Sequence, residues 1–215
     1  GGYSLDEIRN AITRETPASI EPTIDYVVTK IPRFTFEKFP ATEPVLTTQM
    51  KSVGEAMSIG RTFKESFQKA IRSMEVKRFG FGLDKNDRWL AHERRTAAGS
   101  SSTGDESDTD WPISEETMIR KLSVPSQGRL YYVRYAMRMG WSVERIGELT
   151  GIDAWFLDQL HQLVEFEDRL LSWNRIEDVP REVFAEAKQL GYSDPQLAFV
   201  YHGVVSTETI LSVRR

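Results

Sequence analysis

The sequence predicts an α+β chain in which helices dominate, with a small strand-and-helix portion followed by an all-helical portion. Polar and apolar residues alternate from Lys51 to Ile59, and the residues that follow have the 3.6-residue apolar spacing of a helix. Beyond residue 112 every periodic stretch has the helical spacing. The segment between the two portions has no such period. We therefore divide the chain into residues 1–78, a flexible acidic linker at 79–111, and residues 112–215.

The composition restricts the class of protein. Hydrophobic residues make up 40% of the 215 positions, as in ordinary globular proteins, so global disorder is not expected. The absence of cysteine excludes disulfides, thiolate metal sites and a cysteine nucleophile. The net charge of −4 predicts no general attraction to nucleic acid or anionic membranes. No apolar run approaches the roughly 20 residues of a membrane span. We expect a cytoplasmic protein with no nucleic-acid partner and no membrane partner.

The first residues carry signals for a short helix and a strand. Ser4 lies three residues before Glu7, which is the spacing of a capping box, and predicts a helix that ends near Asn10. The run DYVVTKI at residues 25–31 is rich in β-branched and aromatic residues, so it predicts a strand. Pro32 should end that strand because proline has no N–H to donate.

A second strand and a helix follow as one unit. The alternation from Lys51 to Ile59 predicts the strand, and Thr62, three residues before Glu65, predicts the start of the helix by a second capping box. The alternation suggests three inward side chains on the strand: Val53, Met57 and Ile59. The helix has one apolar face to lay on the strand, formed by Phe63, Phe67, Ala70, Ile71 and Met74.

The linker prediction follows from composition. Periodicity is lost from Val76 to Trp111, and the small residues of Ala97–Gly104 lead into a group of acids: Asp105, Glu106, Asp108 and Asp110. Such a mixture cannot bury apolar surface. Clustered acids can bind calcium, but this group lacks the glycine and the closing glutamate of an EF-hand loop. A flexible linker is the better interpretation.

Seven helices are expected beyond the linker. Most begin at a capping serine or aspartate or at a proline in the first turn, and several end at a glycine or before a proline. They are expected from Ser114 to Pro125, Leu130 to Gly140, Ser142 to Gly151, Asp153 to Leu170, Pro180 to Leu190, Asp194 to Tyr201, and Ser206 to Val213.

Two long stretches of the sequence resemble a known family. The run SIEPTIDYVVTKIPRF, followed by LTTQMKSVGEAMSIGRTFKESFQKAIRSME, resembles the end of the first, carboxyphosphate-forming ATP-grasp domain in large subunits of carbamoyl-phosphate synthetase. The later run RLYYVRYAMRMGWSVERIGELTGIDAWFLDQL resembles the helical oligomerisation domain of the same subunits. The resemblance implies that residues 1–78 are the C-terminal portion of an ATP-grasp domain and that residues 112–215 are an all-α oligomerisation domain.

The resemblance also implies a function for a larger parent protein. That parent would be a glutamine-dependent ligase that uses ATP, with Mg²⁺ or Mn²⁺, to make carbamoyl phosphate for arginine and pyrimidine synthesis. Its expected partners are the remainder of the large subunit, a small glutaminase subunit or domain, and other copies of itself through the helical domain. The alternative from another class is a free-standing helical interaction domain without catalytic activity.

The chain itself shows no complete active site. It has no glycine-rich phosphate loop, and its first sixty residues have no carboxylate–asparagine cluster for magnesium, so we expect no catalytic, cofactor-binding or metal-binding residue. The resemblance suggests that one segment, Lys51, Ser52, Gly54 and Glu55, lines the nucleotide cleft or the tunnel for intermediates. These residues also suit the solvent face of a strand, with Gly54 allowing close backbone approach.

Two further interpretations concern the helical portion. Tyr131 and Trp155 fall off the apolar stripes, and exposed aromatic residues of this kind are enriched at interfaces, so both are candidates for an association surface. Residues 142–160 also fit the plan of a DNA-binding helix-turn-helix. The second helix is strongly acidic, which would repel phosphates, so DNA binding is disfavoured.

Overall fold

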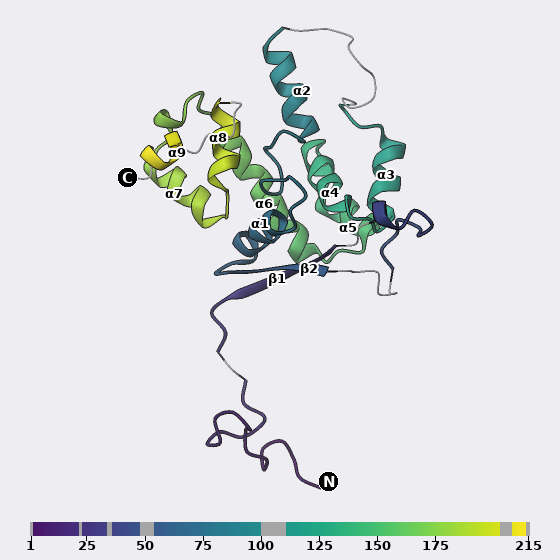
Figure 1. Ribbon diagram of the computed structural model, residues 1–215, viewed down its shortest axis with the longest axis vertical. Coiled ribbons are helices and arrows are strands. Elements are labelled where there is room, and N and C mark those ends of the chain that lie inside the picture. Colours follow the sequence, from purple (N-terminus) through teal and green to yellow (C-terminus); the bar gives the residue numbers. More distant parts are fainter. Residues whose placement is uncertain are drawn as a thin grey trace.

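A computed structural model of the chain describes residues 2–21, 23–33, 36–47, 54–99, 111–202 and 208–213. Helices dominate this part of the chain, and a small two-stranded sheet lies beneath α1 and the lower end of α6 in Figure 1. The helix-dominant fold expected from the sequence is therefore confirmed. Lys51, Ser52 and Val53 lie outside the described residues, as do residues 100–110 of the acidic segment.

The sheet and the first helix form one packing unit. Its elements are β1 (Val27–Arg33), β2 (Gly54–Gly60) and α1 (Phe63–Ser73). The strands are antiparallel, with Val27 opposite Gly60 and Arg33 opposite Gly54. Helix α1 packs on one face of this sheet, where the Thr29 and Ser66 hydroxyls lie 2.7 Å apart in a hydrogen bond. The predicted strand–turn–helix arrangement is confirmed.

The facing of β2 was predicted wrongly. Met57 is 58% exposed and Ile59 55% exposed, whereas Ala56 and Gly60 face α1. The helix comes so close to the strand that a Cβ added to Gly60 would lie 2.7 Å from the Ser66 amide nitrogen. The inner face must therefore carry small residues. Alternation in a sequence gives the period of a strand but not which of its two faces is covered.

Helix α1 begins as its capping signals predict. The Thr62 hydroxyl accepts a hydrogen bond from the Glu65 amide at 3.3 Å. The Glu65 carboxylate accepts in return from the Arg61 amide at 2.8 Å, so the reciprocal bond reaches one residue further back than in the standard box. The apolar stripe is buried at Phe67, Ala70, Ile71 and Met74.

The helix expected near the N-terminus is absent from the described residues. Ser4 and Glu7 do interact, because the Ser4 amide donates to the Glu7 carboxylate at 2.8 Å, but the chain there forms turns. Leu5 is 63% exposed and Ile12 is 92% exposed. A helix this short is not stable without an apolar partner to cover its stripe. Figure 1 shows this stretch running away from the rest of the molecule.

The flexible-linker prediction is wrong for residues 79–99. Phe81 and Leu83 are buried in the core at 1% and 0% exposure, and helix α2 (Arg88–Ala97) follows them. Composition misled here because glycines and charged residues surround the two large apolar side chains. The remaining residues 100–110 of the predicted linker lie outside the described residues.

The helical portion follows the predicted order. Its elements are α3 (Glu115–Ser123), α4 (Arg129–Arg138), α5 (Val143–Thr150), α6 (Ala154–Leu171), a 3-10 turn (Ile176–Asp178), α7 (Arg181–Gln189), α8 (Asp194–His202) and α9 (Glu208–Val213). Ser114, Ser142 and Asp153 cap their helices as expected. Gly151 ends α5 with a φ of 68°, a conformation that glycine adopts without strain.

One core runs from α1 through the 79–90 segment to α6, α7 and α8. The longest helix, α6, lies at its centre and contributes Leu157, Leu163 and Leu170 at 0% exposure. None of the helices in the described ranges is both long and apolar enough to cross a membrane.

Candidate functional site

The predicted cleft segment lies partly within the described residues. Glu55 is at the start of β2, where its carboxylate forms an ion pair with Lys30 of β1 at 2.8 Å. Both side chains are about half exposed. Gly54 beside it has no neighbour within 4 Å of an added Cβ among the described residues, so the close approach expected there is absent from them. Lys51 and Ser52 lie outside these residues.

The sheet face opposite α1 is exposed and largely apolar. Val28 lies opposite Ile59 across the two strands, and Met57 lies opposite Lys30. Val28, Met57 and Ile59 are 41%, 58% and 55% exposed. We call these three residues, with Lys30 and Glu55, the outer sheet face. Contiguous apolar residues on an exposed strand pair are typical of a surface that another element covers.

A second exposed group consists of aromatic rings. Trp155 and Phe156 at the start of α6 are 53% and 43% exposed. Their rings lie 5.7 Å and 5.2 Å from that of Phe63 in α1, measured between centroids. Tyr131, the other candidate for the association surface, is half-buried, and the guanidinium of Arg78 lies 4.1 Å from its ring centroid. Of the two candidates, only Trp155 is mostly exposed.

A network of buried charges joins the 79–90 segment to α4 and α6. The Arg134 side chain is fully buried, and its Nη2 lies 2.8 Å from Asp87 and 2.7 Å from Glu167. Arg138 reaches the same Glu167 oxygen at 2.5 Å and also pairs with Asp168. We call Asp87, Arg134, Arg138 and Glu167 the buried charge network. A Cβ on Gly82 would lie 2.1 Å from Arg134 Nε, so only glycine leaves room for this guanidinium.

Electrostatics fix the ionisation of two members of this network. Burial alone would raise the pKa of Asp87, but Arg134 and a hydrogen bond from the Leu83 amide outweigh it and lower the pKa below its usual range. Burial likewise opposes the charge of Arg134, but Asp87 and Glu167 hold the pKa of its guanidinium well above normal. Both groups therefore stay charged near neutral pH.

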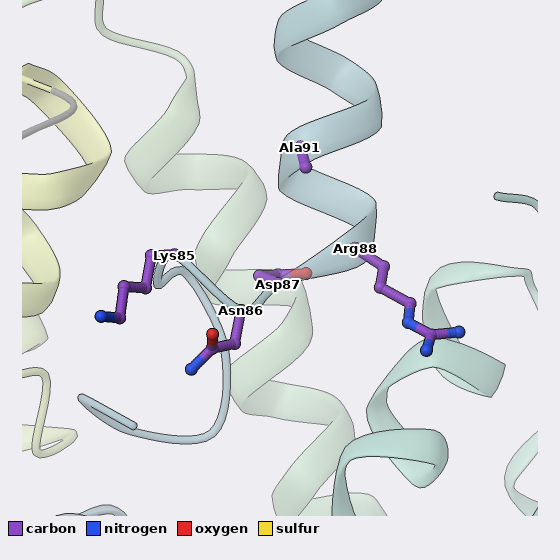
Figure 2. Close-up of a pocket in the computed structure, with 5 residues that line it drawn as sticks. All are labelled: Lys85, Asn86, Asp87, Arg88 and Ala91. Atoms are coloured by element: carbon purple, nitrogen blue, oxygen red, sulfur yellow. The ribbon is translucent and has the colours of Figure 1, made fainter. Parts of the chain in front are cut away.

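The pocket next to this network has no convergent chemistry. It has a volume of about 240 Å³ and is lined by Lys85, Asn86, Asp87, Arg88 and Ala91 (Figure 2). Figure 2 shows the Lys85 and Arg88 side chains extending in opposite directions. Asp87 is committed to Arg134 and to capping α2. These residues therefore do not form a constellation of nucleophile, base and acceptor.

Metal binding also finds no support in the part of the chain that is described. No group of three or more histidine, cysteine, aspartate or glutamate side chains within it is arranged to hold a metal ion. His161 lies on α6 with its Nδ1 3.6 Å from Glu165, in an exposed pair.

Sequence reasoning missed the buried charge network, although a signal for it was present. Glu167 falls four residues after Leu163 and three before Leu170, on the buried stripe of its helix. Arg134 falls at the same spacing between Leu130 and Met137. A charged residue on an apolar stripe predicts a buried ion pair, because an unpaired charge there would be too costly.

Comparison with known proteins identifies the family. The family model described as "Carbamoyl-phosphate synthetase large chain, oligomerisation domain" matches residues 55–105 and 94–215. The chain belongs to this family. The match to the oligomerisation domain includes most of β2, all of α1 and the 79–99 segment.

The oligomerisation-domain assignment agrees with individual relatives. A carbamoyl phosphate synthase large chain of Archaeoglobus fulgidus is 48% identical over 94% of this chain, and one of a Nostoc species is 52% identical over 92%. An arginine-specific, chloroplastic large chain of Arabidopsis thaliana is 47% identical over 92%. The chain spans only 17%, 16% and 15% of these three proteins, respectively. The resemblance stated from the sequence is thereby confirmed, while the ATP-grasp origin of residues 1–78 stays a prediction.

Proposed function

We propose that this chain is part of the large subunit of a glutamine-dependent carbamoyl-phosphate synthetase, an ATP-dependent carbon–nitrogen ligase. The whole protein would make carbamoyl phosphate from bicarbonate, ammonia or glutamine, and two ATP. Support comes from the family match and from relatives with about half of their aligned residues identical. The name of the Arabidopsis relative favours arginine synthesis, and the family resemblance adds pyrimidine synthesis.

The outer sheet face is the observation that carries this proposal to the chain's own role. Two antiparallel strands alone are marginally stable, and here one face is covered by α1 while the other presents three large apolar residues. A chain that spans about a sixth of its relatives' length leaves ample sequence to cover that face. We propose that the remainder of the large subunit, as an ATP-grasp domain, continues the sheet and packs there.

The nucleotide cleft and its cofactors would belong to the remainder of the large subunit. ATP and Mg²⁺ or Mn²⁺ would bind to residues outside this chain, which by itself is not expected to be active. The segment Lys51, Ser52, Gly54 and Glu55 would form part of the cleft or tunnel wall, and the exposure of Glu55 is compatible with that position. We further propose that the large subunit has a small glutaminase subunit or domain as its partner and that it is located in the cytoplasm.

Self-association is the second role of this part of the protein. The family's oligomerisation domain accounts for most of the chain. We propose the ring cluster of Phe63, Trp155 and Phe156 as a contact surface, because large exposed aromatic residues supply most of the binding energy in many interfaces. Tyr131 is a weaker candidate because most of its surface is already covered.

The experiment that tests the proposal is the mass of the natural polypeptide. An antibody raised against this 24.7 kDa chain should detect a band several times larger in the source cells. Immunoprecipitates should hydrolyse ATP in a bicarbonate-dependent reaction, and the purified 215-residue chain should not. A sole band at the size of the chain itself would favour the free-standing interaction domain instead.

A further inference from the structure

A pocket at the start of α4 has a different character from the one near Lys85. It has a volume of about 310 Å³, and the residues that matter in its lining are Met74, Val76, Arg78, Gly128 and Tyr131. We call it the Arg78–Tyr131 pocket. It lies between the end of α1, the segment that follows it, and the first turn of α4. Hydrogen-bond donors without acceptors gather in its lining.

Arg78 is the first of these donors. Its side chain is 8% exposed, its Nη1 donates to the Asn86 carbonyl at 3.0 Å, and its Nε lies 3.0 Å from Asp84. Its Nη2 is buried and has no acceptor among the residues that the structure describes. Buried guanidinium nitrogens are normally paired, so an unpaired one in a pocket lining suggests a missing acceptor.

Tyr131 is the second donor. Its hydroxyl is also buried and has no hydrogen-bond partner within the described ranges. Burial raises the pKa of Tyr131 to about 12, so the phenol keeps its proton at neutral pH and can only donate to an anion. Because the Arg78 guanidinium lies over this ring at 4.1 Å, the two free donors belong to one stacked pair.

The N-terminus of α4 is a further feature of this pocket. Its N-cap is Gly128 and no side chain caps it, although the Arg129 and Tyr131 amides already donate to the Ser126 and Gly128 carbonyls, each at 3.1 Å. An uncapped helix N-terminus carries partial positive charge and attracts anions. The other capped helices around it, such as α3 and α5, use a serine hydroxyl for this purpose.

We propose that the Arg78–Tyr131 pocket binds a small oxyanion, with Arg78 Nη2 and the Tyr131 hydroxyl as its donors and the partial positive charge at the N-terminus of α4 as a further attraction. A carboxylate or phosphoryl group provides the acceptors that the two side-chain donors lack. The pocket holds about ten waters by volume, at roughly 30 Å³ each, so it has room for a few atoms beyond the anionic group. Met74 and Val76 give those atoms an apolar wall.

The test is calorimetric titration of the full chain with inorganic phosphate and, separately, with butyrate, at constant ionic strength maintained with sodium chloride. The matched variants are Tyr131→Phe, which removes only the free hydroxyl, and Tyr132→Phe, which removes a neighbouring hydroxyl that does not line this pocket. At least one anion should bind. Its affinity should fall about tenfold in Tyr131→Phe, since a hydrogen bond to a charged group is lost, and should be unchanged in Tyr132→Phe.

Folding does not obscure this test. Without ligand, Tyr131→Phe should unfold at the same temperature as the unsubstituted chain or slightly higher, because the lost hydroxyl had no partner among the described residues. If neither phosphate nor butyrate binds, the proposal is overturned. It is equally overturned if binding is the same in both variants, because the anion would then sit elsewhere. Binding of phosphate alone would identify phosphoryl ligands, and binding of butyrate would identify carboxylates.

Discussion

The outer sheet face and the buried charge network reverse the usual distribution of residues. Val28, Met57 and Ile59 are apolar and exposed, whereas Asp87, Arg134 and Glu167 are charged and buried. The charges are already paired within the chain, although the buried Arg134 Nη1 has no hydrogen-bond acceptor among the described residues. The apolar face has no covering element among the described residues. The outer sheet face is therefore the region that the proposed ATP-grasp neighbour would cover, whereas the ion pairs of the buried charge network form within the chain.

The largest effect should come from breaking the buried charge network. Glu167→Gln keeps the size of the side chain but leaves Arg134 and Arg138 without their shared carboxylate. We expect the free energy of unfolding to fall by about 3–5 kcal/mol, the usual result of removing one partner of a buried pair. Urea denaturation followed by circular dichroism measures it. Glu165→Gln, at an exposed position on the same helix, should cost less than about 0.5 kcal/mol. Equal losses in the two variants would show that the network adds no stability.

The pH dependence of stability sharpens the same comparison. The folded state lowers the pKa of Asp87, so its contribution is fully present above the unfolded value of about 4 and is lost as the pH falls through the lower folded value. Burial raises the pKa of Asp84 despite Arg78, so its contribution has the opposite sign and is lost as the pH rises. The difference in free energy of unfolding between the unsubstituted chain and Asp87→Asn should be constant from pH 8 to about 5 and shrink below about 4. A difference that shrinks between pH 8 and 6 would contradict the lowered pKa of Asp87.

The smallest effects should separate the two faces of the sheet. Gly60→Ala places a Cβ against the Ser66 backbone, and we expect a loss of about 1–3 kcal/mol from overpacking. Met57→Gln on the outer sheet face should change stability by no more than about 0.5 kcal/mol in this chain. Gly54→Ala, in open space, is the control for glycine replacement itself. Thermal unfolding of the three variants ranks their losses of stability. A large loss of stability in Met57→Gln would mean that the outer sheet face is already covered.

Local signals in the sequence predicted local structure well. The caps at Thr62, Ser114 and Ser142 and the glycine stop at Gly151 depend on residues three or four positions apart, and the structure confirms all four. The seven helices beyond residue 112 were found for the same reason. Their apolar stripes have a period that needs no knowledge of the partner element.

Features that depend on distant contacts were predicted less well. Whether Met57 or Ala56 faces inward is decided by the position of α1. The alternation of polar and apolar residues does not predict that position. The burial of Phe81 and Leu83 depends on distant parts of the core, such as Phe67 of α1, whose ring centroid lies 5.3 Å from that of Phe81, rather than on their glycine-rich surroundings. The pairing of Arg134 with Glu167 joins two helices, and that of Tyr131 with Arg78 joins a helix to a loop. Both were visible only in the fold.

Arg134 also determines how the molecule can come apart. It shares one guanidinium nitrogen between Asp87, in the loop before α2, and Glu167, in α6, so neither segment can move away without breaking an ion pair in the core. Segments joined in this way open together. A loop such as the one before α2 is a common site of proteolysis. This loop should nevertheless resist cleavage until the helices of the core unfold.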